Sequence, residues 1–125
     1  MPLDERWKRG LRLFNEKEFF ECHDVIEELW LETDSADPHR NLYKGVIQAA
    51  AALYQYQRGI PSGAFGLYRT SVSYLKKYAP RALGLDVRQL VGDMNACFEH
   101  LKGQKDARHA PIPARLVPRL RYRFS

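Results

Sequence analysis

The chain has 125 residues, 45% of them hydrophobic, which suits one globular domain with a small core. No apolar run is long enough to span a bilayer, and charged residues interrupt the N-terminus where a signal peptide would lie, so we predict a soluble, cytoplasmic protein with no membrane partner. The net charge of +5 comes from the C-terminus, because residues 1–102 carry 14 basic and 14 acidic side chains, whereas residues 103–125 carry six basic side chains and one acidic.

The N-terminal residues predict an amphipathic helix. Asp4 can cap it, and Trp7, Leu11 and Phe14 recur at i, i+4 and i+7. Asn15 has an acidic residue three positions later, which is the spacing of a capping box, so we expect the first helix to end and the second to begin there. A turn this short predicts that the two helices pack antiparallel.

The stretch 18–32 predicts a second helix with an unusually wide apolar surface. Glu21 lies on its narrow polar stripe. An apolar surface of this width needs packing partners on at least two sides, so we expect this helix to be the central one. Its apolar arc consists of Phe19, Phe20, Cys22, Val25, Ile26, Leu29, Trp30 and Leu31.

His23 and Glu27 are spaced i, i+4 and fall inside this apolar arc, so both should be at least half buried. Burying a carboxylate without a partner is costly, so Glu27 needs His23 or a group from another helix. One interpretation is a satisfied internal pair. The other is a general acid/base pair, with His23 and Glu27 as the catalytic candidates, or half of a metal site.

A third helix should follow the polar loop 33–38, with Asp37 as its cap and Pro38 in its first position, and extend to about Arg58. The four alanines at 49–52 permit close backbone approach. Lys44, Gln48 and Gln55 gather on one stripe, and we expect Lys44 or Gln48 to reach Glu27 from the edge of the interface.

Two further helices complete the predicted fold. Ser62 can cap a fourth helix that Pro80 ends, and Asp86 can cap a fifth that Gly103 closes. No segment has the pattern of a strand. The sequence therefore predicts an all-α fold, a compact array of about five helices in a single domain over residues 1–103, with an extended basic tail over 104–125.

The two cysteines and the remaining histidines give no metal signal. Cys22 and Cys97 lie on apolar helical faces without a ligand spacing, so two reduced, buried thiols are expected rather than a disulfide or a ligand pair. His39, His100 and His109 show no ligand spacing either and are expected at the surface. We predict no metal and no cofactor.

The motif Phe-Phe-Glu-x-His-Asp-x-x-Glu-x-x-Trp from Phe19 to Trp30, followed by Lys44-Gly45-x-Ile47-Gln48-x-Ala50 and Gly63-Ala64, resembles the helical proteins of domain of unknown function family 309. The resemblance covers about residues 10–100. It implies a helical array in an intracellular protein, with the motif on the second helix and a supporting element on the third, and it implies no activity. Family members often carry Asn where Ile60 stands and His where Tyr54 stands, so no ligand role carries over to these positions. The motif residues are Glu21, His23, Glu27, Trp30, Gly45, Gln48, Gly63 and Ala64.

Two functions follow from the motif. The first is a binding or interaction module whose polar pocket, between the second and third helices, takes a small polar or anionic ligand or a protein partner. The second is a hydrolase-like enzyme that uses His23 and Glu27, with or without a metal, so the sequence leaves open whether the protein is an enzyme. The expected ligand-binding residues are Glu21, His23, Glu27, Trp30, Lys44 and Gln48.

A third function follows from the tail, which would bind nucleic acid or an acidic partner. Arginines interleaved with Tyr122 and Phe124 suit phosphate contact and base stacking. The prolines of the tail predict an extended segment, whose apolar residues can instead lie across the helices or on another subunit of a homodimer. The arginines are Arg115, Arg119, Arg121 and Arg123.

Overall fold

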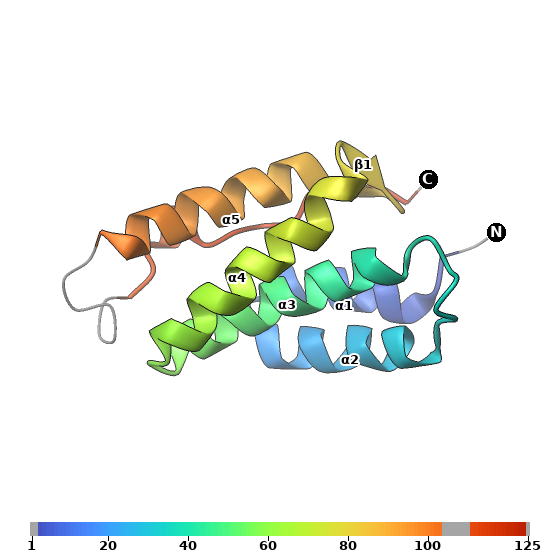
Figure 1. Ribbon diagram of the computed structural model, residues 1–125, viewed down its shortest axis with the longest axis horizontal. Helices are drawn as coiled ribbons and strands as arrows, with labels where there is room; N and C mark the ends of the chain where they lie inside the picture. The colour runs from blue at the N-terminus through green and yellow to red at the C-terminus, as the bar shows by residue number, and fades with distance from the viewer. Residues whose placement is uncertain (1–2, 104–110, 125) are drawn as a thin grey trace.

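The structure is a computed structural model and describes residues 3–103 and 111–124. Within these residues it contains five α-helices, which confirms the predicted all-α array (Figure 1). They are α1 (Glu5–Asn15), α2 (Phe19–Glu32), α3 (Arg40–Gln57), α4 (Pro61–Leu75) and α5 (Val87–Lys102). Two 3₁₀ turns, η1 (Lys76–Tyr78) and η2 (Ala114–Leu116), and a hairpin of two-residue strands, β1 (Arg81–Ala82) and β2 (Leu85–Asp86), complete the described chain. No helix among the described residues has the length and apolarity to cross a membrane.

The central helix is α3. The second helix packs against α1 and α3 and so has partners on two sides, as predicted, but α3 lies between α2 and α4 and buries more of its residues (Figure 1). Its glycine and alanines allow neighbouring helices to approach from both sides. The expectation that α2 is central is wrong, because Phe20 and Leu31 at its margins stay exposed, at 47% and 67% of their surface.

The contact between α3 and α4 is close because Gly45 has no side chain. A Cβ atom at Gly45 would lie 2.7 Å from Leu75 Cδ2 and 2.8 Å from Leu75 Cγ. At the same place the fully buried Ser71 donates a hydrogen bond of 2.7 Å from its hydroxyl to the Gly45 carbonyl oxygen. Gly45, a residue of the family motif, therefore serves packing rather than ligand binding.

Asn15 does not form the predicted capping box. It is the last residue of α1, and the N-cap of α2 is Glu18, which makes no side-chain capping hydrogen bond. The Asn15 amide instead donates to the Leu120 carbonyl oxygen at 2.9 Å and accepts from the Leu120 N–H at 2.6 Å. A local capping pattern is thus overridden by a partner 105 residues away in the chain.

Helix boundaries differ from the predictions at two other places. Asp37 accepts from the His39 N–H, which forms a local turn, and α3 begins only at Arg40. Ser62 lies inside α4, whose N-cap is Ile60 because Pro61 occupies the first helical position. The predicted Asp86 cap is confirmed, since its carboxylate accepts from the Gln89 N–H at 3.0 Å.

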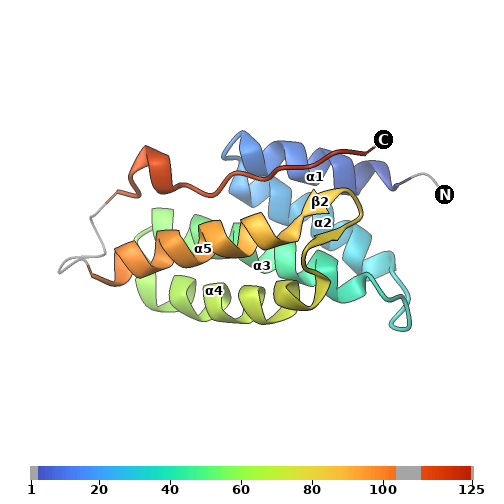
Figure 2. The ribbon, with the colours of Figure 1, turned by 90° about the horizontal axis from the view of Figure 1, so that it is seen from above.

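Residues 111–124 lie on the body of the protein, alongside α5, α1 and the hairpin (Figure 2). The Asp86 N–H donates to the Arg121 carbonyl oxygen and the Arg123 N–H donates to the Gly84 carbonyl oxygen, both at 2.8 Å. Gly84 has a φ of +79°, and a Cβ atom there would lie 2.5 Å from the Arg123 carbonyl oxygen. The described part of the tail is therefore docked. Residues 104–110, the first part of the predicted extension, lie outside the described residues.

We predict that Gly45→Ala destabilises the protein by about 1–3 kcal/mol, because the added methyl group must displace the Leu75 side chain. Gly92→Ala is the matched control, since a Cβ atom at Gly92 in α5 meets nothing within 4 Å, and the change should stabilise by about 0.5–1 kcal/mol. Urea unfolding measures both. Equal effects of the two substitutions would contradict this packing role.

Candidate functional site

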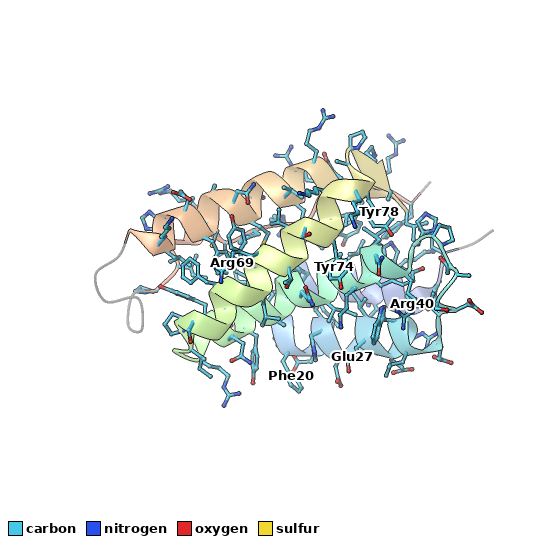
Figure 3. The ribbon with its side chains drawn as sticks, in the orientation of Figure 1. Phe20, Glu27, Arg40, Arg69, Tyr74 and Tyr78 are labelled. Carbon is cyan, nitrogen blue, oxygen red and sulfur yellow. The ribbon has the colours of Figure 1, made fainter. Side chains whose placement is uncertain are left out.

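The helices α2 and α3 meet along two facing stripes, which together we call the α2–α3 seam. Figure 3 shows Phe20 and Glu27 on the α2 side. On α2 the stripe has the spacing i, i+3, i+7, i+10, and on α3 the spacing i, i+4, i+7, i+11, so each stripe lies on one helix face. The stripes face each other because Lys44 lies over the Trp30 ring at one end and Phe20 packs against Tyr54, beside the stripe, at the other. The seam consists of Phe20, His23, Glu27 and Trp30 with Lys44, Gln48, Ala51 and Gln55.

His23 and Glu27 contact each other within α2, with 3.0 Å between Nε2 and Oε2. Their side chains are 30% and 42% exposed, so both are more than half buried, as predicted. In the described part of the chain no hydrogen bond or ion pair links Glu27 to Lys44 or Gln48, so the expected interaction across the two helices is wrong. The Lys44 ammonium lies 4.3 Å from the centre of the Trp30 ring instead, where it gains a cation–π contact.

Trp30 marks the cationic end of the seam. The Arg40 guanidinium carbon lies 4.2 Å from the centre of its ring, so two cations lie over one indole. Within the described residues, no carboxylate lies within ion-pairing distance of Arg40 or Lys44. The Trp30 indole N–H is buried and has no hydrogen-bond partner there.

Two amide side chains of α3 also lack partners. The Oε1 atoms of Gln48 and Gln55 are buried, and neither has a hydrogen-bond partner in the described part of the chain. A buried polar group without a partner costs about 1–3 kcal/mol. The seam thus contains three such atoms: one donor, on Trp30, and two acceptors.

A cavity of about 220 Å³ lies between α2 and α3, where the sequence predicted a pocket. Of the six expected ligand-binding residues only His23 lines it. Gln55 belongs to the polar stripe predicted on α3, whereas Phe20 belongs to the predicted apolar arc and no sequence pattern points to Arg58. The lining residues are Phe20, His23, Ala51, Tyr54, Gln55 and Arg58.

The other predicted site residues lie elsewhere. Glu21 is exposed and lines no part of the cavity, whereas Glu27, Trp30, Lys44 and Gln48 belong to the seam beyond it. Ala64 is fully buried in the core, and Gly63 is exposed in the first turn of α4. The motif therefore combines packing residues with seam residues.

Cys22 and Cys97 are free and buried, as predicted. Burial raises the pKa of each thiol to about 12, so neither supplies a thiolate nucleophile at neutral pH. Residues 3–103 and 111–124 contain no cluster of three or more His, Cys, Asp or Glu side chains suited to a metal ion. His39 and His100 are partly exposed, and His109 lies outside the described residues.

A sequence model of the family described as "Domain of unknown function (DUF309)" matches residues 7–67. This segment belongs to that family. The match runs from α1 into α4 and so contains the whole α2–α3 seam, while α5 and the tail lie beyond it. The predicted family is confirmed, over a shorter stretch than the motifs indicated.

Two relatives extend the comparison. The chain is 34% identical over 88 residues to "Uncharacterized protein YpuF" of Bacillus subtilis (strain 168), a match that covers 69% of this chain and 50% of the relative. It is 22% identical over 107 residues to an "Uncharacterized protein" of Aquifex aeolicus (strain VF5), which covers 86% of this chain and 31% of the relative. The chain thus spans half or less of the length of these relatives. No solved structure gives a significant match.

We predict that the double substitution His23→Leu with Glu27→Met changes the free energy of unfolding by less than about 1 kcal/mol, because a partly exposed i, i+4 pair contributes only a few tenths of a kcal/mol. Urea unfolding of the double and both single variants measures this. Ile26→Ala in the same helix is the control that should cost about 2–5 kcal/mol. A loss above about 2 kcal/mol in either single variant would assign the pair to the structural core instead.

Proposed function

We propose that this protein is a binding or interaction module that holds a small polar or anionic ligand in the α2–α3 seam. The observation that carries the proposal is the set of three buried polar atoms without partners: Trp30 Nε1, Gln48 Oε1 and Gln55 Oε1. They belong to side chains of the two stripes that form the seam. A ligand in the cavity would reach Gln55, and one that extends along the seam to Gln48 and Trp30 would recover all three hydrogen bonds that folding leaves unmade.

Apolar residues at these positions would stabilise the fold. Methionine has nearly the shape of glutamine and no group that requires a partner, so it fits the same space without the desolvation cost. A protein that keeps polar side chains there gives up stability, and this is typical of functional sites. The same reasoning applies to both glutamines, since Gln48 and Gln55 lie on one face of α3.

The charges of the seam indicate the chemistry of the ligand. Arg40 and Lys44 lie at one end, and Arg58 lines the cavity at the other, so a negative group is favoured at either end. The glutamine oxygens require a donor, so the ligand should also carry an N–H or O–H group. The rings of Phe20 and Tyr54, 5.3 Å apart between centres, offer an apolar wall for a planar group.

A hydrolase-like activity of His23 and Glu27 stays a prediction, with no added observation in its favour. Neither thiol serves as a nucleophile, and the described hydrogen bonds link no serine or threonine hydroxyl to the pair. A cytoplasmic location and a homodimer are likewise expectations from the sequence.

A second candidate function, binding of nucleic acid or an acidic partner through the tail, is favoured by one specific observation. Arg115, Arg119, Arg121 and Arg123 are all exposed, while Leu120 between them is buried. The docked tail therefore keeps its charges available to a partner.

We predict that Gln48→Met and Gln55→Met each raise the free energy of unfolding by about 1 kcal/mol, because each removes a buried acceptor without a partner. Gln57→Met is the control, since Gln57 is an exposed residue of α3, and it should change stability by less than about 0.5 kcal/mol. Chemical unfolding measures all three. Lower stability of both seam variants would show that their amides already have partners.

Ligand binding is tested with the wild type, Gln55→Met, Gln57→Met and one further variant, Lys44→Met. A thermal-shift panel of inorganic phosphate, small carboxylates and nucleoside monophosphates should contain a compound that stabilises the wild type, by about 2.7 kcal/mol at a hundred times its Kd. The Gln55→Met and Lys44→Met variants should lose this shift, whereas Gln57→Met should keep it. A shift of equal size in all four proteins would place the binding site outside the seam.

A further inference from the structure

We propose that the docked tail and the body around it form one composite basic surface that binds the phosphodiester backbone of nucleic acid without contact with the bases. This inference rests on the second candidate function and deepens it, because it names the partner, the groups that are recognised and the body residues that take part.

Side chains along the tail alternate between buried and exposed positions. In an extended segment, successive side chains point to opposite faces and every second residue is about 6.6 Å further along. Leu120 is buried and Tyr122 half-buried, so Arg119, Arg121 and Arg123 project to solvent in a row. This spacing is similar to that of successive phosphates along a nucleic-acid strand.

Hydrogen bonds to the backbone of the tail hold this row of arginines in place. The Gln89 amide donates to the Arg119 carbonyl oxygen, Asn15 holds both backbone groups of Leu120, and the hairpin holds Arg121 and Arg123. The arginines therefore extend from a backbone that is already ordered. Binding through them costs less conformational entropy than binding through a free tail.

The fold adds cations of α1 on one side of the tail. Lys8 and Arg12 belong to the helix whose last residue, Asn15, holds Leu120. The Lys8 ammonium lies 5.7 Å from the centre of the Phe124 ring, so the tail runs antiparallel to α1. Arg12, which is exposed, lies between Lys8 and Asn15 along α1 and therefore in the part of α1 that runs beside residues 120–124.

Two more arginines lie in the hairpin that holds the tail and in the helical turn that follows it. Arg81 donates to the Gly84 carbonyl oxygen, which also accepts from the Arg123 N–H, and Arg88 lies in the first turn of α5 beside Asp86. Both are exposed. From the sequence, the charge excess belonged to the tail alone, whereas the fold adds four cations of the body, from α1, the hairpin and the first turn of α5. The composite basic surface consists of Lys8, Arg12, Arg81, Arg88, Arg119, Arg121 and Arg123.

Few carboxylates oppose this charge. Glu5 pairs with Lys8 at 3.6 Å, the Asp86 carboxylate caps α5, and Asp93 accepts from the Gln89 amide. Among the described residues, no carboxylate lies within ion-pairing distance of the six arginines of this surface. A polyanion is the partner that complements such a surface.

The aromatic residues of the tail decide which part of a nucleic acid is contacted. The rings of Tyr122 and Phe124 stack on each other, 5.0 Å apart between centres, and pack against the core of the body. They alternate with the exposed arginines and are partly buried against the body, which leaves little of either ring for the base stacking that the sequence suggested. The contacts left to the surface are those to phosphates, which carry no sequence information.

The test measures the affinity of the full chain for 20-nucleotide single strands, one of oligo-dT and one of mixed sequence. Fluorescence anisotropy gives the Kd at each of a series of salt concentrations. Four proteins are compared. The wild type stands beside a tail variant (Arg119→Gln, Arg121→Gln, Arg123→Gln), a body variant (Arg12→Gln, Arg81→Gln, Arg88→Gln) and a control variant. The control (Arg69→Gln, Lys76→Gln, Lys77→Gln) also removes three exposed cations, from α4 and η1. Circular dichroism checks that all four fold.

We expect the tail and body variants each to bind at least tenfold more weakly than the wild type at low salt, and the control to bind within twofold of it. Removing three phosphate contacts should lower the slope of log Kd against log salt by about 2. The two oligonucleotides should bind within twofold of each other. A strong preference for one of them would overturn the phosphate-only contact.

The remaining outcomes distinguish a failure of this inference from a failure of the candidate function on which it rests. If only the tail variant binds more weakly, the tail has its role but the composite surface is wrong. If poly-glutamate of equal charge competes as well as DNA, the partner is an acidic polypeptide and the nucleic-acid assignment is overturned. If neither variant differs from the control, the inference and the candidate function both fail.

Discussion

The close packing of α3 against α4 sets the orientation of α3 and, with it, the position of the polar seam. Gly45 lets Leu75 of α4 approach the backbone of α3, and Ser71 satisfies the Gly45 carbonyl oxygen within the same contact. Because these small residues turn one face of α3 towards α4, the stripe of Lys44, Gln48 and Gln55, about 100° further round the helix, is turned towards α2. The polar seam thus follows from a packing constraint, and the family motif combines both, with Gly45 for the packing and Gln48 for the seam.

This arrangement gives the molecule two regions of different chemistry. The seam is narrow, partly buried and lined by cations, amides and aromatic rings, which suits a small ligand with a negative group. The surface around the tail is broad and exposed, with guanidinium groups in a row, which suits a long polyanion. The seam lies inside the matched family segment, and the tail surface lies mostly outside it, so the two regions need not serve the same role in every relative. The chain also spans half or less of the length of the relatives it matches.

Sequence patterns predicted what depends on local periodicity. The five helices, the Asp86 cap and the pairing of His23 with Glu27 all follow from spacings of three or four residues. The patterns failed where a tertiary partner decides the outcome. Asn15 has the spacing of a local cap but forms its hydrogen bonds with Leu120. Lys44 has the charge to pair with Glu27, but its ammonium group lies over the Trp30 ring. The cavity lining depends on which turns of α2 and α3 face each other, and the body cations join the tail only after folding, so neither could be predicted from spacing.

The central claim, that the seam keeps unpartnered polar groups for a ligand, is tested most directly by the two indole N–H signals in a ¹H–¹⁵N NMR spectrum. Trp7 is the internal reference, because its indole N–H donates to the Leu83 carbonyl oxygen at 3.0 Å, whereas that of Trp30 has no partner among the described residues. Without added ligand, the Trp30 indole proton should exchange with solvent faster than that of Trp7. On titration with the small anions of the binding panel, the Trp30 signal should shift to saturation while the Trp7 signal stays in place. Equal protection of both protons in the ligand-free protein would show that Trp30 already has a partner, and would contradict the claim.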